Sequence, residues 1–181
     1  IATAIGCDPH GPNDQPDLSG LRYGKLILMT DADVDGGHIQ ALLLTFLFMH
    51  MPKLVEMGRI YVCQPPLFKV EIPSQGKGKP ARRVYCLDED ELDEALDLLR
   101  KEKVREGSWE ISRFKGLGEM SPEQLWETGM NPDARRLVRM RLDQGGLSKA
   151  RETFELLMDS GEAEGRRNWM REHWRTVEAD I

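Results

Sequence analysis

The sequence predicts an α/β fold, because three segments in its first third follow one another in the order strand, helix, strand. "KLILMT" (25–30) is an apolar run of strand length, and "RIYVCQ" (59–64) is another. Between them, "GHIQALLLTFLFMHMPKLVEMG" is long and mostly apolar, as in a buried helix, with a break expected at Pro52 and an end at Gly58. Such a unit places its two strands parallel, with a right-handed crossover.

The next part of the chain predicts further strands and an acidic helix. "PPLFKVEI" (65–72) and "RVYCL" (83–87) are expected to be extended, with a flexible basic loop between them. The acidic stretch from Asp88 to about Lys101 carries leucines at helical spacing and predicts an amphipathic helix. Residues 1–20 are rich in Pro, Gly and Asp, which indicates a loop.

The C-terminal half is predicted to be mixed and then helical. "WEISRFKGLGEMSPEQLWETGM" combines a strand, a glycine turn and a helix that starts at the Ser121-Pro122 pair. "RRLVRMRL" (135–142) alternates in part, as a strand does. Residues 147–174 are expected to be helical, with a break near Gly161 or Gly165.

Composition bounds the class of protein. The chain has 181 residues, of which 40% are hydrophobic and 31% are charged, enough for one medium domain with a core. Its longest apolar run, residues 41–49, is far shorter than the roughly 20 residues that span a bilayer. Three cysteines without pairing or metal spacing indicate reduced thiols, so the expected location is the cytoplasm. The first residue is Ile rather than Met, which suggests part of a longer protein.

The formal net charge of −6 is unevenly distributed. Residues 88–99 hold seven acids and no base, and outside them 24 acids face 25 bases. Basic clusters occur within residues 77–83, 135–141 and 166–175. Since local patches matter more than the total for binding phosphates, a nucleic-acid partner remains compatible with the acidic total.

Three aspartates, Asp31, Asp33 and Asp35, follow the first predicted strand at alternate positions, where they repel one another unless positive charge lies near. A calcium-binding loop of the EF-hand type is excluded, because its twelfth position is Leu42 and the preceding segment is a strand. A phosphoryl-transfer enzyme with one aspartate as nucleophile is an alternative without clear partner motifs.

The interpretation that fits best is a magnesium site acting on phosphodiesters. Alternate strand residues point the same way, so Asp31 and Asp33 could converge on one cation at the strand's end. Mg²⁺ takes one or two carboxylates together with substrate phosphate oxygens. The structural alternative is a solvated turn in which Asp35 caps the following helix.

Several long segments carry a family resemblance: "TDADVDGGHIQALLLTFLFMHMP", "GRIYVCQPPLFKV", "RFKGLGEMSPEQLWETGMNP" and "ARRLV". In this order they resemble the C-terminal part of the B subunit of bacterial type IIA topoisomerases, which are DNA gyrase and topoisomerase IV. The resemblance implies a TOPRIM-type parallel sheet, incomplete at its N-terminal side, with a helical C-terminal region. We expect the DxDxD part of the TOPRIM domain in residues 1–72, the adjoining α+β segment in 73–142 and a tail contacting the A subunit and DNA in 143–181.

The resemblance also assigns roles to residues. Asp31 and Asp33 are expected to be metal ligands in catalysis, with Asp31 shared if two ions bind, and Asp35 is the supporting third acid of the metal motif. His38, Lys115 and Arg166 are expected to contact DNA. For Lys115 a structural alternative stays open, namely a tight turn that needs Gly116 and Gly118 for backbone reasons.

The implied cofactor is Mg²⁺, which Mn²⁺ or Ca²⁺ can replace in binding, and ATP acts only through domains absent from these residues. The implied partners are DNA and the A subunit, which supplies the tyrosine that attacks DNA in a heterotetramer. Tyr23, Tyr61 and Tyr85 are therefore interpreted as packing residues. The opening "AIGCDPH" and the ending "RRNWMREHWRTVEADI" favour topoisomerase IV, for decatenation and relaxation at the nucleoid, with gyrase as the alternative.

One departure from the family is large. The family's first TOPRIM strand carries a glutamate in a motif like E-G-D-S-A, followed by a basic R-G-K-type segment, and neither occurs here. Both should precede residue 1. The isolated chain is therefore expected to be inactive in cleavage, or to act only as a docking module for the A subunit and DNA.

Overall fold

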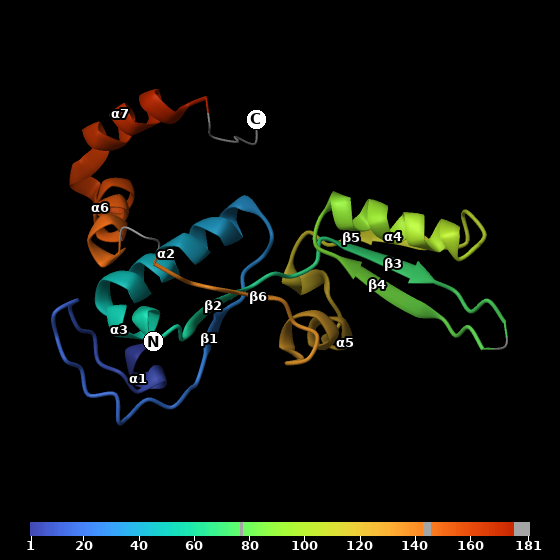
Figure 1. Ribbon diagram of the computed structural model, residues 1–181, viewed down its shortest axis with the longest axis horizontal. Helices are drawn as coiled ribbons and strands as arrows, with labels where there is room; N and C mark the ends of the chain where they lie inside the picture. Colours follow the sequence, from blue (N-terminus) through green and yellow to red (C-terminus); the bar gives the residue numbers. More distant parts are fainter. Residues whose placement is uncertain (77, 143–145, 176–181) are drawn as a thin grey trace. The chain divides into compact units, whose positions relative to one another are not determined.

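The predicted strand–helix–strand unit is present in the structure, a computed structural model that describes residues 1–76, 78–142 and 146–175. Strand β1 (Leu26–Leu28) pairs parallel with β2 (Ile60–Cys63), with Leu26 opposite Ile60. Helices α2 (Val34–His50) and α3 (Pro52–Glu56) connect them (Figure 1). The break falls at Met51, because Pro52 cannot donate the hydrogen bond that would continue α2 and starts α3 instead.

A third strand completes this sheet in the opposite direction. Strand β6 (Leu137–Arg139) pairs antiparallel with β2, so the order is β1-β2-β6. The α/β class is confirmed, and the parallel pair carries an antiparallel edge strand. Periodicity could predict β6 as a strand but not its partner or its direction, since a single strand's pattern carries no information on either.

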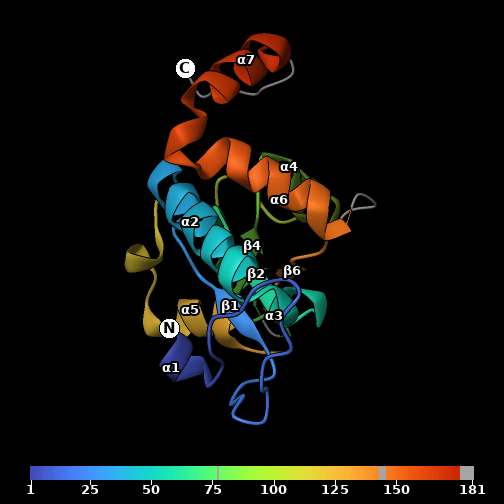
Figure 2. The same cartoon turned by 90° about the vertical axis from the view of Figure 1, so that its left-hand side faces the viewer.

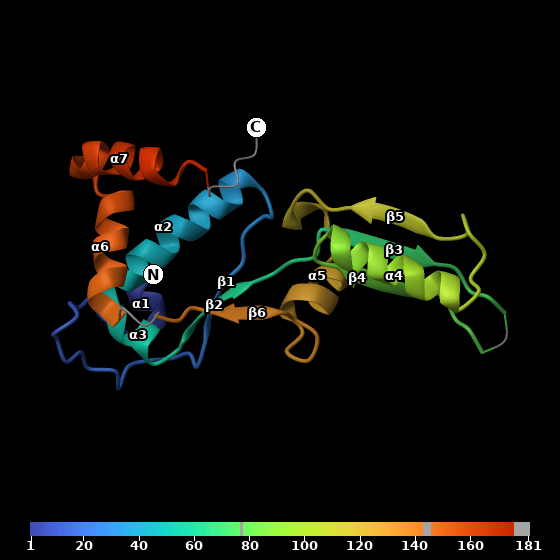
Figure 3. The same ribbon diagram turned by 45° about the horizontal axis from the view of Figure 1, so that its top comes forward.

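A second sheet, which the sequence pattern did not reveal as a separate layer, consists of β3 (Phe68–Ile72), β4 (Arg82–Cys86) and β5 (Glu110–Arg113). All its pairs are antiparallel, in the order β4-β3-β5. The acidic helix α4 (Glu89–Lys101) covers one face (Figure 3), and its buried Leu99 packs with Val70 and Val104. The helix starts as predicted at Asp88, whose Oδ1 accepts a hydrogen bond from the Glu91 N–H at 2.8 Å.

The segment after β5 contains three short helical elements. They are the 3₁₀ helix η1 (Leu117–Glu119), α5 (Pro122–Leu125) and the π-helix η2 (Trp126–Met130). The predicted start at Ser121 is confirmed. Its hydroxyl accepts from the Gln124 N–H, and the Gln124 side chain accepts in return from the Ser121 N–H, so both orphan donors are satisfied.

The N-terminal expectation of a loop was incomplete. Residues Ala2–Ile5 form a short helix, α1, because Gly6 follows it in a left-handed conformation (φ 77°) and its N–H bonds back to the carbonyl of Ala2. An added Cβ at Gly6 would lie 2.0 Å from the carbonyl oxygen of Gly20, so glycine is required here for space as well as for conformation.

The chain forms two compact units. One comprises Ile1–Gly24, Leu43–Arg59 and Met140–Ile181, and the other comprises Lys25–Leu42 and Ile60–Arg139. In the first, α6 (Gly146–Met158) lies beside the C-terminal end of α2 (Figure 2), and the rings of Phe48 and Phe154 stack at 4.7 Å.

The predicted break in the C-terminal helix is confirmed near Gly161. The 3₁₀ turn η3 (Ser160–Glu162) separates α6 from α7 (Ala163–His173), and Gly165 lies inside α7. Asp159 closes the turn by accepting a hydrogen bond from the Gly161 N–H at 2.8 Å. Lys77 of the first basic cluster, and residues 143–145 and 176–181 of the expected tail, lie outside the described residues.

Cys7, Cys63 and Cys86 are buried and free, as expected for reduced thiols. Among the described residues, none of the helices combines the length and the apolar character needed to cross a bilayer.

Candidate functional site

The aspartates lie at the carboxyl end of β1, the end at which open α/β sheets place their sites. Strand β1 ends at Leu28, and the chain continues through Met29 and Thr30 to Asp31. The side chains of Asp31, Asp33 and Asp35 are all exposed. They therefore face solvent, where a cation and a large polyanion could both reach them.

Asp33 caps helix α2. Its Oδ1 accepts a hydrogen bond from the Gly36 N–H at 2.7 Å, and its carbonyl accepts one from the Gly37 N–H at 2.9 Å. Asp35, interpreted above as a possible cap, lies instead in the first turn of the helix. There its negative charge interacts favourably with the positive end of the helix dipole. That interpretation was wrong because the helix starts earlier than its apolar pattern indicates.

Asp31 joins the aspartate loop to the glycine turn 86 residues further along the chain. The Leu117 N–H donates to Asp31 Oδ1 at 2.7 Å. Gly116 lies against the same carboxylate, since an added Cβ would be 2.9 Å from Asp31 Cγ and 3.0 Å from each carboxylate oxygen. One oxygen of Asp31 is thus fixed by a backbone donor, while the glycine leaves room for the group.

The two glycines of this turn differ in what they do. Gly116 is extended (φ −167°), a conformation open to any residue, so its glycine is required for space next to Asp31. Gly118 does not adopt a left-handed conformation either, and an added Cβ there would meet no atom of the described chain within 4 Å. The expectation that both glycines are needed for the backbone conformation of a tight turn was therefore wrong.

The residues predicted to contact DNA are distributed over both units. Lys115, adjacent to Gly116, has an exposed side chain, and its N–H donates to Glu119 Oε2 at 2.8 Å. His38 is exposed one turn into α2. Arg166 belongs to the other unit, where its Nη1 donates to the carbonyls of Leu156, at 3.1 Å, and of Asp159. Its observed contacts join α6 to α7.

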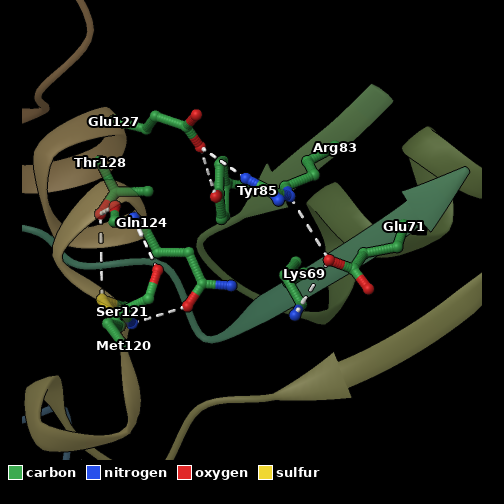
Figure 4. Close-up of polar contacts among 9 residues, drawn as sticks. All are labelled: Lys69, Glu71, Arg83, Tyr85, Met120, Ser121, Gln124, Glu127 and Thr128. Carbon is green, nitrogen blue, oxygen red and sulfur yellow. Dashed lines mark hydrogen bonds and ion pairs between the residues drawn. The ribbon is translucent and has the colours of Figure 1, made fainter. Parts of the chain in front are cut away.

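Sequence reasoning missed a polar network beside η2 (Figure 4). The Tyr85 hydroxyl donates to Glu127 Oε2 at 2.6 Å, and Arg83 Nη1 lies 3.8 Å from the same oxygen. On its other side Arg83 Nε is 3.4 Å from Glu71 Oε1, and this oxygen also forms an ion pair with Lys69 Nζ at 3.3 Å. The interpretation of Tyr85 as a packing residue rests on the expectation that the A subunit supplies the attacking tyrosine. No local pattern reveals the contact with Glu127, 42 residues away.

The surroundings of Tyr85 favour the protonated form of its hydroxyl. Burial raises the pKa of the Tyr85 hydroxyl to about 12, and the hydrogen bond to Glu127 and the charge of Glu127 add to the effect. Tyr85, Arg83 and Glu127 line an open cavity of about 800 Å³ together with Glu71 and other residues of the second sheet and the η2 segment.

The π-helix η2 packs against the sheet that carries the aspartates. An added Cβ at Gly129 would lie 2.8 Å from Met29 Cε and 3.7 Å from Cys63 Sγ, so the backbone of η2 approaches the end of β1 closely. Thr128 is buried, and its hydroxyl donates to the Gln124 carbonyl at 2.8 Å. Single-turn π-helices occur often at functional sites, and this one supports the strand end that leads to Asp31.

The donor set fits Mg²⁺ in the way that this ion is usually held. Within the described residues, no group of three or more His, Cys, Asp or Glu side chains is gathered closely enough to hold a metal alone. Mg²⁺, however, commonly takes one or two carboxylates and completes its shell with water and phosphate oxygens. Asp31 and Asp33 each have one oxygen bonded to a backbone N–H, and their second oxygens accept no hydrogen bond in the described chain.

Two family models match the chain. Residues 14–65 match the Toprim domain, and residues 106–171 match the carboxyl terminus of the DNA gyrase B subunit. The second match includes the glycine turn, η2 and most of the C-terminal helices, and the first includes the three aspartates.

Curated relatives resemble the chain over its full length. It is 46% identical to the B subunit of DNA gyrase from Thermus thermophilus over 100% of its residues. It is 43% identical to the B subunit of DNA topoisomerase 4 from Enterococcus faecalis over 99%, and 40% identical to the corresponding topoisomerase 4 protein from Haemophilus influenzae over 100%. The chain spans about a quarter of each of these proteins, between 25% and 26% of their lengths.

Proposed function

Because the chain belongs to the B-subunit family of type IIA topoisomerases, with a Toprim domain and a gyrase B carboxyl-terminal region, we propose that it supplies the Mg²⁺-binding acids of a double-strand DNA cleavage and religation site. The parent protein would be an ATP-dependent type II topoisomerase acting on DNA with an A subunit, in the cytoplasm at the nucleoid.

The observation that carries this proposal is the hydrogen bond between Asp31 and the Leu117 N–H. It brings together, within one unit of the fold, the acids expected to bind metal and the turn bearing the lysine expected to contact phosphate. An exposed Lys115 next to exposed carboxylates suits a substrate that is both a metal ligand and a polyanion.

Each residue has a proposed task. Asp31 and Asp33 would hold Mg²⁺ through their second oxygens, with Asp35 as a supporting charge, and Lys115 and His38 would orient the DNA phosphates. When bound, Mg²⁺ stabilises the charge on the attacking and leaving oxygens of a phosphodiester. The attacking tyrosine is proposed to come from the A subunit. In the unit that comprises Met140–Ile181, Arg166 and the tail are proposed to contact DNA and the A subunit.

Topoisomerase IV is our proposal for the branch, and gyrase is the alternative. The opening and closing segments of the sequence favour topoisomerase IV, while names from both branches occur among the relatives. For residues 1–181 alone we propose docking to the A subunit and DNA without cleavage, because these residues contain no E-G-D-S-A-type motif with the glutamate that the family resemblance implies.

The test uses the full-length B subunit with its A subunit, ATP and Mg²⁺ on supercoiled, relaxed and interlinked DNA circles. Wild type is compared with Asp31→Asn and Asp33→Asn. Asparagine caps a helix as well as aspartate does, so Asp33→Asn removes the charge and leaves the start of α2 intact. Loss of strand passage in both variants is expected, and activity at the wild-type level in both would refute the metal role.

The same assay separates the two branches. Unlinking of circles without introduction of negative supercoils is expected for topoisomerase IV. Introduction of negative supercoils by the wild-type enzyme would identify gyrase instead.

A further inference from the structure

We propose that the backbone N–H of Leu117 is a positioning group for the carboxylate of Asp31, and that residue 116 is glycine because a side chain there would displace that carboxylate. This inference rests on the proposed metal role of Asp31. It assigns to the glycine turn a second task besides the expected contact of Lys115 with phosphate.

The Leu117 N–H donates directly to the carboxylate of Asp31. At 2.7 Å, the contact from the Leu117 N–H to Asp31 Oδ1 joins a neutral donor to a charged acceptor, a pairing stronger than one between neutral groups. It fixes one oxygen of an exposed side chain that would otherwise rotate. Partners of this kind orient a metal ligand and are nearly as important to affinity as the ligand.

The glycine turn is held in place by its own hydrogen bonds. The Lys115 N–H donates to Glu119 Oε2, and the Glu119 N–H donates to the Gly116 carbonyl at 3.2 Å. The Met120 N–H donates to the Leu117 carbonyl, also at 3.2 Å. These bonds within the turn hold the Leu117 N–H in position towards Asp31, as preorganisation of a site requires.

Gly116 has little space for a side chain on the side that faces Asp31. Its extended backbone would accept alanine without strain, but the new Cβ would lie 2.9 Å from Asp31 Cγ. The crowded atoms belong to the end of a short exposed side chain, so this side chain would move while the backbone stays in place. Gly116→Ala should then displace the carboxylate without unfolding the protein.

The experiment removes the donor and measures binding of Mn²⁺ to the full-length B subunit without nucleotide, by electron paramagnetic resonance. Leu117 is the first residue of η1, where proline is accommodated, and the extended Gly116 before it suits a proline neighbour. Leu117→Pro lacks the N–H and should bind Mn²⁺ about tenfold or more weakly, the usual cost of losing such a partner. The matched control Leu117→Ala keeps the N–H and should bind as wild type does.

A second pair of variants tests whether a side chain at residue 116 displaces the Asp31 carboxylate. Gly116→Ala should weaken Mn²⁺ binding, whereas Gly118→Ala, whose Cβ meets no described atom within 4 Å, should not. If Gly116 acts through Asp31, then Gly116→Ala should add nothing in an Asp31→Asn background. Circular dichroism melting curves close to wild type would exclude loss of fold as the cause.

The possible outcomes distinguish the two proposals. Weak binding by Asp31→Asn, together with wild-type binding by Leu117→Pro and Gly116→Ala, would overturn the positioning role and leave the metal site standing. Wild-type Mn²⁺ binding by Asp31→Asn would overturn both. Weakened binding by Leu117→Pro and Gly116→Ala, with both controls normal, is the expected result.

Discussion

At the scale of single residues, Tyr85 makes the stability of the fold depend on pH in the alkaline range. Its pKa of about 12 in the fold exceeds the value of 10.0 for an unperturbed tyrosine, because burial and Glu127 disfavour the ionised form. The folded chain therefore keeps the proton more tightly than the unfolded chain. Below the unfolded pKa both states are protonated; above it the unfolded state loses its proton first, and stability falls as pH rises towards the folded pKa.

We therefore predict that the melting temperature of wild type falls more steeply than that of Tyr85→Phe between about pH 10 and about pH 12. Tyr23→Phe is the control, because Tyr23 is exposed and its variant retains Tyr85. Parallel slopes for wild type and Tyr85→Phe would mean that the hydroxyl is solvated and the contact with Glu127 does not form.

At the scale of elements, the first turn of α2 depends on one of two adjacent glycines. An added Cβ at Gly36 would lie 2.1 Å from the carbonyl oxygen of Asp31, and this backbone atom cannot move aside easily. An added Cβ at Gly37 would meet nothing described within 4 Å. The two positions share a helical conformation and differ in available space.

The expected effects on the free energy of unfolding have opposite signs. Gly36→Ala should lower it by about 1–3 kcal/mol through overpacking. Gly37→Ala should raise it by up to about 1 kcal/mol, the difference in helix propensity between the two residues. Urea unfolding of the two variants and wild type measures both, and an equal shift in the two variants would contradict the close approach of Asp31 to Gly36.

At the scale of the whole molecule, the C-terminal helices and the second sheet should differ in local stability. Helices α6 and α7 contain no buried residue, whereas Phe68, Val70 and Ile72 of β3 are buried. Amides that open without exposing a core exchange with solvent faster. Hydrogen–deuterium exchange of the full-length B subunit should therefore be faster in α6 and α7 than in β3.

Adding the A subunit and DNA tests the proposed role of this tail. Exchange in α6 and α7 should then slow, while exchange in β3 should stay unchanged. Unaltered exchange in both helices on assembly would argue against the tail as the docking surface.

The sequence predicted most elements, because helix breaks and strand runs are local properties. Pro52 and Ser121 mark an element boundary by their own chemistry, and the structure places boundaries at both. The contact between Asp31 and Leu117 was not predictable in this way, since it joins residues 86 positions apart. The sequence also could not predict why residue 116 is glycine. Its extended conformation is open to any residue, and only the structure shows the Asp31 carboxylate next to it. The π-helix η2 has no sequence signature that separates it from an α-helix.

The second sheet and α4 lie entirely within the stretch of chain that the Asp31–Leu117 contact closes into a loop. Loop closure depends only on the logarithm of length, so doubling such a loop costs roughly 0.6 kcal/mol. Close contacts with Leu117, Gly116 and the first turn of α2 set the position of the acid, whatever the length of the chain between them. Evolution can therefore lengthen or shorten the layer formed by β3, β4, α4 and β5 while the chemistry at the end of β1 stays the same.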